Sequence, residues 1–186
     1  MFNGDFRYVE IIYDIAWEVY YKLRRDLIYV YEYDLSKYEL SSFDSCDTSL
    51  ILVDDLKKMR AYLNIVRYAF KMSIFYYLAI SMDVLWEMLF DTNIKNYLLV
   101  NNLKEVIGTV SLGKTTHRNC KESCVLSNFA LSKEFIGKKL SYNAMHSVLN
   151  FAKVCGYKYI RLKVKKVNVP ALKVYSALGF IEMEDI

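Results

Sequence analysis

The chain has 186 residues, of which 54% are hydrophobic, and this is enough for one domain with a sizeable buried core. Six glycines and one proline leave little material for linkers or low-complexity segments, so the sequence predicts a continuously folded chain. The 25 Lys and Arg residues are spread among 21 Asp and Glu residues, and the mild net charge of +4 favours a small anionic ligand over a nucleic-acid groove.

The cysteines give no sign of a disulfide framework. They lie at Cys46, Cys120, Cys124 and Cys155, and no secretory signal opens the chain, so we expect a reduced, cytoplasmic protein. His117, Cys120 and Cys124 would make three metal ligands with no fourth in view. A plain hairpin turn is the better interpretation, and we expect no metal.

The first part of the chain predicts an amphipathic helix in "YVEIIYDIAWEVYYKLRRDLIYV". The apolar residues at helical spacing are Val9, Ile12, Ala16, Val19, Leu23 and Leu27. A polar stretch, "SKYELSSFDSCDTS", then marks a boundary. We therefore expect an N-terminal helical extension over residues 1–48 and a second unit over residues 49–186. In an alternative register, "FRYVEII" forms the first strand and residues 13–80 form an enlarged helical insert.

Two helices are expected after the short apolar run "SLILV". Asp54 and Asp55 suit a helix start, and "LKKMRAYLNIVRYAF" follows at helical period. A second helix covers part of residues 72–91. Residues 68–90 look long enough for a membrane span, but their longest uncharged run, residues 72–82, is about half of the roughly 20 residues required. We expect a helix pair and no membrane contact.

The remainder alternates between strands and helices. "NYLLVNN" and "EVIGTVSLGK" predict a hairpin joined by Asn-Asn-Leu-Lys, and "SCVLSNFAL" predicts a third strand. "KKLSYNAMHSVLNFAKVCG" predicts a helix closed by Gly156, and "YKYIRLKVKK" predicts another strand. The last two strands should run parallel through this crossover helix. Ligands bind where such strands diverge, so the loop between Leu131 and Leu140 is the expected site.

The segment "NVPALKVYSALGF" predicts a helix that runs beside an extended ligand. Pro170 suits a first helical turn, and Asn168 either caps the helix or bonds a ligand amide. Tyr175 lies one turn beyond the small Ala171 on the same face, and Gly179 ends the helix. The plain alternative is an ordinary capped helix with a tyrosine in the core.

Over about residues 49–182 the chain resembles the GNAT superfamily of acyl-CoA-dependent N-acyltransferases. The second motif of that family is Asn, two residues, Ala, three residues, Tyr, three residues, Gly-Phe. The matching positions here are Asn168, Ala171, Tyr175, Gly179 and Phe180. Upstream, Gly108 stands in the third strand of the family pattern, where a glycine is usual.

The first motif of the family is degenerate here. It normally reads Arg or Gln, two residues, Gly, one residue, then Gly or Ala. The best alignment places over it Ile136, Gly137, Lys138, Lys139, Leu140 and Ser141. Lys139 replaces the central glycine, which narrows the approach of the CoA pyrophosphate to the helix amides but adds a positive charge near Lys133 and Lys138. A charge-assisted phosphate clamp or a solvated lysine face would both fit.

The resemblance implies a mixed α/β fold: a GNAT-like, mostly antiparallel sheet with one parallel strand pair, flanked by helices. It implies acetyl-CoA as co-substrate, bound by the six residues of that loop and by Asn168 and Ala171. The main chain of Phe129, Ala130 and Leu131 would pair with the pantetheine arm like an added strand.

The resemblance also implies a reaction. An acetyl group would move to a primary amine of an unidentified acceptor, with Tyr175 serving the departing thiolate and a backbone amide near Ala130 serving the thioester oxygen. No general base is evident, because His117 and Glu122 read as ordinary loop residues. The alternative is an inactive relic of the fold that binds CoA or a partner protein.

Only six residues, 181–186, follow the second motif, whereas the family continues through a further loop and strand. Six residues form one short strand at about 3.3 Å per residue but not a hairpin. We therefore expect the last strand to be missing beside the strand at 158–165. The helical extension, or a second copy of the chain in a homodimer, should cover that side.

Overall fold

A computed structural model of the chain describes residues 28–38, 48–72, 74–89, 93–114 and 122–183. In chain order the elements are β1 (Ile28–Asp34), the 3-10 turn η2 (Leu35–Lys37), β2 (Thr48–Leu52), α2 (Leu56–Phe70), α3 (Ile74–Leu89), β3 (Ile94–Asn101), β4 (Val106–Lys114), β5 (Ser123–Leu131), the 3-10 turn η4 (Lys133–Phe135), α4 (Leu140–Val154), β6 (Tyr159–Lys165), α5 (Val169–Leu178) and β7 (Ile181–Met183).

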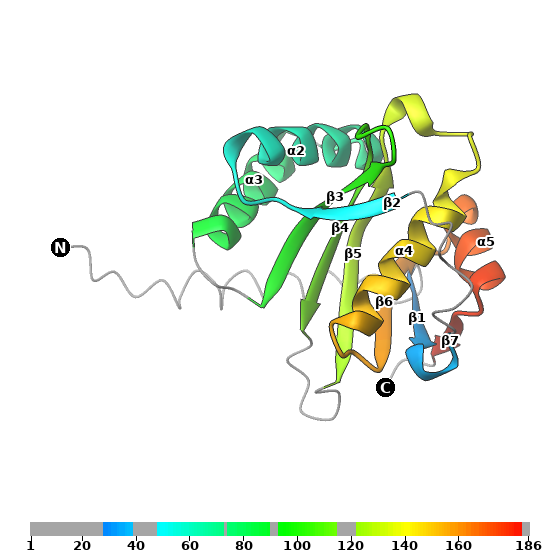
Figure 1. Cartoon of the computed structure of the whole chain (residues 1–186). Coiled ribbons are helices and arrows are strands. Elements are labelled where there is room, and N and C mark those ends of the chain that lie inside the picture. Colours follow the sequence, from blue (N-terminus) through cyan, green and yellow to red (C-terminus); the bar gives the residue numbers. More distant parts are fainter. Residues whose placement is uncertain (1–27, 39–47, 73, 90–92, 115–121, 184–186) are drawn as a thin grey trace.

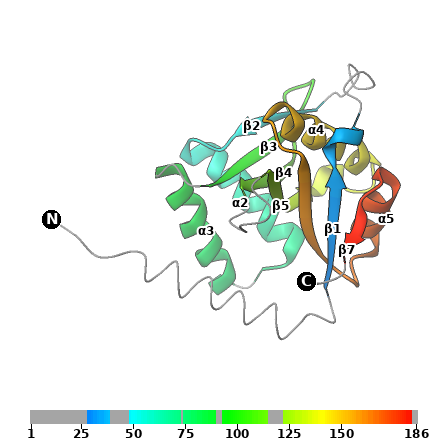
Figure 2. The same ribbon diagram turned by 90° about the horizontal axis from the view of Figure 1, so that it is seen from below.

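The described strands form one sheet of seven in the order β2-β3-β4-β5-β6-β1-β7 (Figure 1). Every neighbouring pair is antiparallel except β5 and β6, which run parallel. The views in Figures 1 and 2 show α2 and α3 on one face of the sheet and α4 on the other, with α5 beside β1 and β7. The mixed α/β fold with one parallel pair is therefore confirmed.

The helix pair expected within residues 54–91 is present as α2 and α3. The Asp55 carboxylate caps α2 by accepting a hydrogen bond from the Lys58 amide at 2.7 Å, as an aspartate at a helix start predicts. Tyr62 and Val66 on the inner face of α2 pack against Leu98 of β3. Within the described part of the chain, no helix is both long and apolar enough to cross a membrane.

The crossover from β5 to β6 also follows its prediction. Helix α4 buries Ala144, Val148 and Leu149 against the sheet, and its face joins α5 in one apolar core. After α4 the Gly156 amide donates to the Lys153 carbonyl at 3.0 Å, and Gly156 has a φ of +86°. Glycine adopts this left-handed conformation without a side-chain clash, so its position fixes the end of the helix.

Strand β1 differs from the helical extension that we expect over residues 1–48. Its sequence, IYVYEYD, is rich in residues that favour strands, and Tyr31 pairs with Leu162 of β6 on one side and Glu182 of β7 on the other. At these residues the extension is therefore a strand inside the sheet. The helix expected at residues 9–27 and the alternative strand "FRYVEII" lie outside the described residues, and the boundary at residue 48 stays a prediction.

The same strand covers the side of β6 that the short C-terminus was expected to leave open. Strand β7 has only three residues and pairs with β1 rather than β6. Glu32 of β1 stands opposite Arg161 of β6 and forms an ion pair with it. The place beside β6 is therefore filled by β1, a strand from the N-terminal part of the same chain.

Candidate active site

The parallel strands β5 and β6 separate halfway along their length. Their ladder joins residues 123–126 to residues 159–162 and then stops. Beyond this point, among the described strands, β5 continues along β4 alone, while β6 continues along β1 to Lys165. The β6 side of Phe129, Ala130 and Leu131 therefore has no partner among the strands that the structure describes, which is the condition for an extended ligand to pair there.

A β-bulge lies where the two strands begin to diverge. Thr109 of β4 pairs with Ala130, but Ser111 pairs with Ser127, so β5 carries one extra residue over this interval. Within it Asn128 has a left-handed φ of +51°, and the Thr109 hydroxyl donates to the Asn128 carbonyl at 2.9 Å. The bulge re-aims the main chain of β5 at the place where the thioester oxygen is expected.

A buried hydrogen-bond chain supports the bulge from the face of α2 and α3. The Ser111 hydroxyl donates to the side-chain oxygen Oδ1 of Asn96 at 2.6 Å, and the side-chain nitrogen Nδ2 of Asn96 donates to the Glu87 carboxylate. Because the single Ser111 proton is used there, the Tyr62 hydroxyl donates to Ser111 Oγ at 2.6 Å, and Asn128 Nδ2 donates to it at 3.2 Å. Asn128 is thus held by its side chain as well as its main chain.

Burial raises the pKa values of two groups in this hydrogen-bond network. It raises the pKa of Glu87 to about 7, although the Asn96 hydrogen bond acts in the opposite direction. Burial also raises the pKa of Tyr62 well above its usual value. Sequence reasoning missed these groups because the members of the network come from five different helices and strands, and no local spacing connects them.

Helix α5 confirms the helical interpretation of the second motif. The Asn168 side-chain oxygen accepts a hydrogen bond from the Ala171 amide at 3.4 Å, so this asparagine caps the helix. Pro170 lies in the first turn, and Gly179 ends the helix with a φ of +90°. Ala171 is half-buried at the start of the helix, beside the carboxyl end of β6.

Tyr175 lies deep on the inner face of α5, with 6% of its surface exposed. Its ring centroid is 6.4 Å from that of Tyr31 and 5.4 Å from that of Phe180. Burial raises the pKa of Tyr175 to about 12. The phenol therefore keeps its proton at neutral pH and can act as a hydrogen-bond donor.

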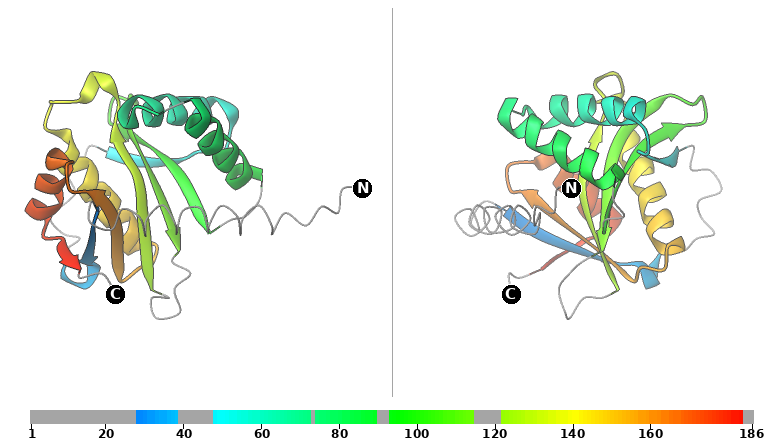
Figure 3. Two further views of the ribbon diagram at one scale, coloured as in Figure 1. Left: turned by 180° about the vertical axis from the view of Figure 1, so that it is seen from behind. Right: turned by 90° about the vertical axis from the view of Figure 1, so that its left-hand side faces the viewer.

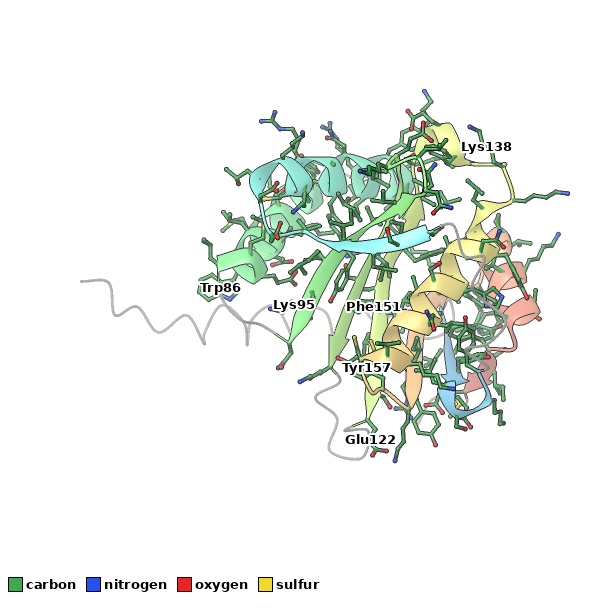
Figure 4. All side chains as sticks on the ribbon, in the orientation of Figure 1. Trp86, Lys95, Glu122, Lys138, Phe151 and Tyr157 are labelled. Carbon is green, nitrogen blue, oxygen red and sulfur yellow. The ribbon has the colours of Figure 1, made fainter. Side chains whose placement is uncertain are left out.

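The loop between β5 and α4 presents the start of a helix without a side-chain cap. Gly137 and Lys139 have left-handed φ values of +82° and +59°, and α4 begins with Leu140 and Ser141. Lys139 at the N-cap makes no side-chain hydrogen bond to the first amides of α4, so its side chain leaves them open to a ligand. Ile136 and Lys138 are exposed on the same loop, and Figure 4 shows Lys138 on the outside of it.

Lys139 occupies the position of the central glycine in the degenerate first motif. It is the residue before α4, and its left-handed backbone is the conformation that glycine adopts most easily. The backbone at this position is thus one that glycine favours, although the residue is a lysine. The structure brings together all six loop residues of the motif at the start of α4.

Gly108 fits the predicted strand pattern for a steric reason. A Cβ atom added there would lie 2.4 Å from the carbonyl oxygen of Ala130. Any side chain at this position would push β5 out of place beside the diverging strands. The glycine is therefore required by the close approach of two backbones.

Glu122 is remote from this site. It precedes β5, pairs with Lys158 at 2.8 Å, and lies at the opposite end of the molecule from Lys138 in Figure 4. Its separation from Leu131 along the strand is about 30 Å. His117 and Cys120 lie outside the described residues, and Cys124 is buried, which raises its pKa to about 12. The described residues contain no cluster suited to a metal ion.

Solved structures with this architecture include acetyltransferases. A functionally unknown conserved protein from Staphylococcus epidermidis superposes with a TM-score of 0.64 at 15% identity, over 88% of this chain and 62% of that protein, so this chain spans less than two thirds of its length. The spermidine N-acetyltransferase of Vibrio cholerae in complex with CoA and spermine superposes with a TM-score of 0.60 at 17% identity, over 75% of this chain and 84% of that one. At such identities the likeness shows the fold alone.

A family comparison goes further. No curated protein matches this sequence. The profile of the acetyltransferase (GNAT) family, however, matches residues 62–180, which is more than half of the chain and runs from α2 to the end of the second motif. The chain belongs to the GNAT family of acetyltransferases.

Proposed function

We propose that this protein transfers an acetyl group from acetyl-CoA to a primary amine of an acceptor still to be identified. The observation that carries the proposal is the divergence of β5 from β6 at a bulge, beside the uncapped start of α4 and the complete second motif. This arrangement supplies a strand edge for the pantetheine arm and helix amides for the pyrophosphate. We place the reaction in the cytoplasm.

In this proposal the cofactor lies along the open edge of β5. The main-chain groups of Phe129, Ala130 and Leu131 that face away from β4 pair with the pantetheine arm. The phosphates meet the loop that leads into α4, where Lys138 and Lys139 add positive charge to the backbone donors. The remaining cofactor contacts come from Ile136, Gly137, Leu140, Ser141, Asn168 and Ala171.

The oxyanion of the tetrahedral intermediate is assigned to a backbone amide near Ala130, just beyond the bulge. Tyr175 is assigned to the departing thiolate. With its pKa near 12, this phenol is a weaker acid than an ordinary thiol of pKa about 8.5. Tyr175 therefore stabilises the thiolate chiefly by donating a hydrogen bond, and solvent supplies the final proton.

A second candidate function is a CoA-binding or protein-interaction module without catalysis. The observation that favours it is Lys139 in place of the central glycine of the first motif. A lysine side chain there obstructs the closest approach of a phosphate to the backbone.

Calorimetry with acetyl-CoA, followed by an assay of amine-dependent thiol release, separates the two functions. Binding with release supports acetyl transfer. Binding without release from any amine supports the inactive module. Absence of binding at millimolar acetyl-CoA contradicts the cofactor site and leaves only protein interaction.

A further inference from the structure

An open hollow of about 590 Å³ lies between the carboxyl end of α2 and the loop that follows β5. Arg67, Tyr68, Lys71 and Met72 line it from the α2 side, and Ile136 lines it from the loop. Figures 1 and 3 show these two segments together at one end of the molecule, at the carboxyl end of β5. The hollow therefore opens at the edge of the proposed acetyl-transfer site.

The hollow is positively charged. Arg67 and Lys71 are the charged residues of its lining, and neither forms an ion pair with any residue that the structure describes. Lys133 adds a third positive charge, since its Nζ lies 5.7 Å from the ring of Tyr68. The acidic residue nearest in sequence to any lining residue is Glu134, two positions before Ile136. It is exposed on η4 and is not part of the lining.

The cation at Arg67 is held in place. Its guanidinium carbon lies 5.1 Å from the centre of the Tyr77 ring on α3, a cation–π contact that restricts the side chain without neutralising it. Tyr68 and Met72 add apolar surface to the same hollow. A fixed positive group beside apolar walls suits an organic ligand that carries an anionic group.

The hollow adjoins the expected phosphate loop at Ile136, but the rest of its lining comes from the carboxyl end of α2. The phosphates would meet the start of α4, whereas α2 lies on the opposite face of the sheet (Figure 2). Helix α2 also packs over β5 and is tied to the bulge through Tyr62 and Ser111. A ligand in the hollow would thus approach β5 from the face opposite to α4.

We propose that this hollow binds the acceptor and selects a primary amine that also carries a carboxylate or a phosphate. The inference rests on the proposed acetyl transfer, whose acceptor class it names. A polyamine such as spermine would instead meet two uncompensated positive charges, those of Arg67 and Lys71.

The test is equilibrium binding of matched amine pairs to the CoA-saturated protein by calorimetry. One pair is phosphoethanolamine and ethanolamine, a second is tyrosine and tyramine, and spermine is the polycation. The R67Q/K71Q variant removes both cations of the hollow. The K57Q/R60Q variant removes two exposed cations from the opposite half of the same helix and is the matched control.

The wild-type protein should bind the anionic member of at least one pair about tenfold more tightly than its partner, equal to about 1.4 kcal/mol. R67Q/K71Q should abolish this ratio, with an unchanged dissociation constant for acetyl-CoA, and K57Q/R60Q should retain it. Tighter binding of spermine or of both uncharged amines overturns the inference. So does a loss of acetyl-CoA affinity in R67Q/K71Q with no change in the amine ratio, because CoA itself would then occupy the hollow.

A failure of the proposed acetyl transfer would give different results from a failure of the proposed acceptor class. If the ratio holds but acetyl-CoA releases no thiol with any amine, the hollow is an anion-selective site and the proposed transfer is wrong. If thiol release occurs and uncharged amines or spermine are preferred, the transfer stands and the acceptor class is wrong.

Discussion

At the scale of single residues, Tyr175 combines deep burial with a place in the second motif. We expect Tyr175→Phe to lower kcat about 100-fold, because the thiolate loses its hydrogen-bond donor, while the dissociation constant of acetyl-CoA stays the same. Steady-state kinetics and calorimetry on the same preparation measure the two quantities. An equal loss of cofactor affinity would mean that the phenol binds CoA rather than assists its departure.

Lys139 should have opposite effects on two quantities, since its left-handed backbone lowers the stability of the fold while its charge strengthens the binding of acetyl-CoA. The substitution Lys139→Gly separates them. Lys139→Gly should raise the free energy of unfolding by about 0.5–1 kcal/mol, because glycine tolerates the left-handed backbone. It should also raise the dissociation constant of acetyl-CoA several-fold, since a positive charge near the phosphates is lost. Urea unfolding and calorimetry give the two results.

The control for this substitution is Lys104→Gly in the β3–β4 hairpin, where a lysine has a similar φ of +61°. It should give the gain in stability without a loss of cofactor affinity. Tighter cofactor binding by Lys139→Gly would show that the lysine side chain obstructs the phosphate more than its charge helps.

Glu87 should make stability depend on pH. Its pKa is about 7 in the folded protein and 4.5 as the reference value, so between these pH values the folded state holds a proton that the unfolded state has lost. Stability from this group therefore falls as pH rises from about 4.5 to about 7, by up to about 3 kcal/mol, and changes little outside that window. Asp83 raises the pKa of Glu87 further, and Lys95 and Asn96 lower it.

Urea unfolding at several pH values compares the wild type with Glu87→Gln, which keeps an oxygen for the Asn96 amide. The difference between the two curves should change across that window, with the variant gaining on the wild type as pH rises. Burial lowers the pKa of His146 and gives an opposite trend, but this contribution cancels in the difference. Parallel curves would show that Glu87 titrates in the ordinary range.

At the scale of the elements, the bulge in β5 depends on a close contact with β4. Gly108→Ala should destabilise the fold by about 1–3 kcal/mol and reduce acetyl transfer sharply, because its Cβ would displace the Ala130 carbonyl. Gly113→Ala on the same strand is the matched control. Its Cβ would meet Ile94 Cγ1 at 2.9 Å, which costs stability but leaves the Ala130 carbonyl in place, so activity should survive.

Equal effects of the two substitutions on activity would contradict a special role for the β4–β5 contact. Thermal unfolding and thiol release on both variants decide the matter.

Elements with local signals could be predicted from the sequence, and elements defined by distant partners could not. The start of α2 is marked by its N-cap residue Asp55. The two ends of α5 are marked by Asn168 and Gly179, so each of these boundaries can be predicted from a few neighbouring residues. No capping residue marks the ends of β1 in this way, and its place in the sheet depends on Leu162 and Glu182, which lie more than a hundred residues away. Its alternating tyrosines were the available clue, and the helical period of the preceding residues obscured it.

The candidate site divides in the same way. The motif positions from Ile136 to Ser141 and from Asn168 to Phe180 could be read directly, because each set is contiguous in the chain. The bulge at Asn128 and the acid at Glu87 are tertiary features, since strand register and burial create them. The covering role of residues 1–27 and a homodimer stay predictions.

At the scale of the whole molecule, the sheet order explains how two central strands can separate. β5 retains its ladder with β4, and β6 retains its ladder with β1, so neither loses all its partners where the parallel pairing stops. The N-terminal strand β1 therefore contributes to the site, although it holds none of the motif residues. It gives β6 the outer neighbour that the three-residue β7 does not provide.

We propose that the place where β5 and β6 diverge is an acetyl-transfer site. Incubation of the protein with acetyl-CoA and a panel of primary amines tests this, with free thiol followed over time and products identified by mass. We predict thiol release that requires both acetyl-CoA and an amine, together with an amine product heavier by one acetyl group. Bound acetyl-CoA with no acetylated amine across the panel would contradict the claim.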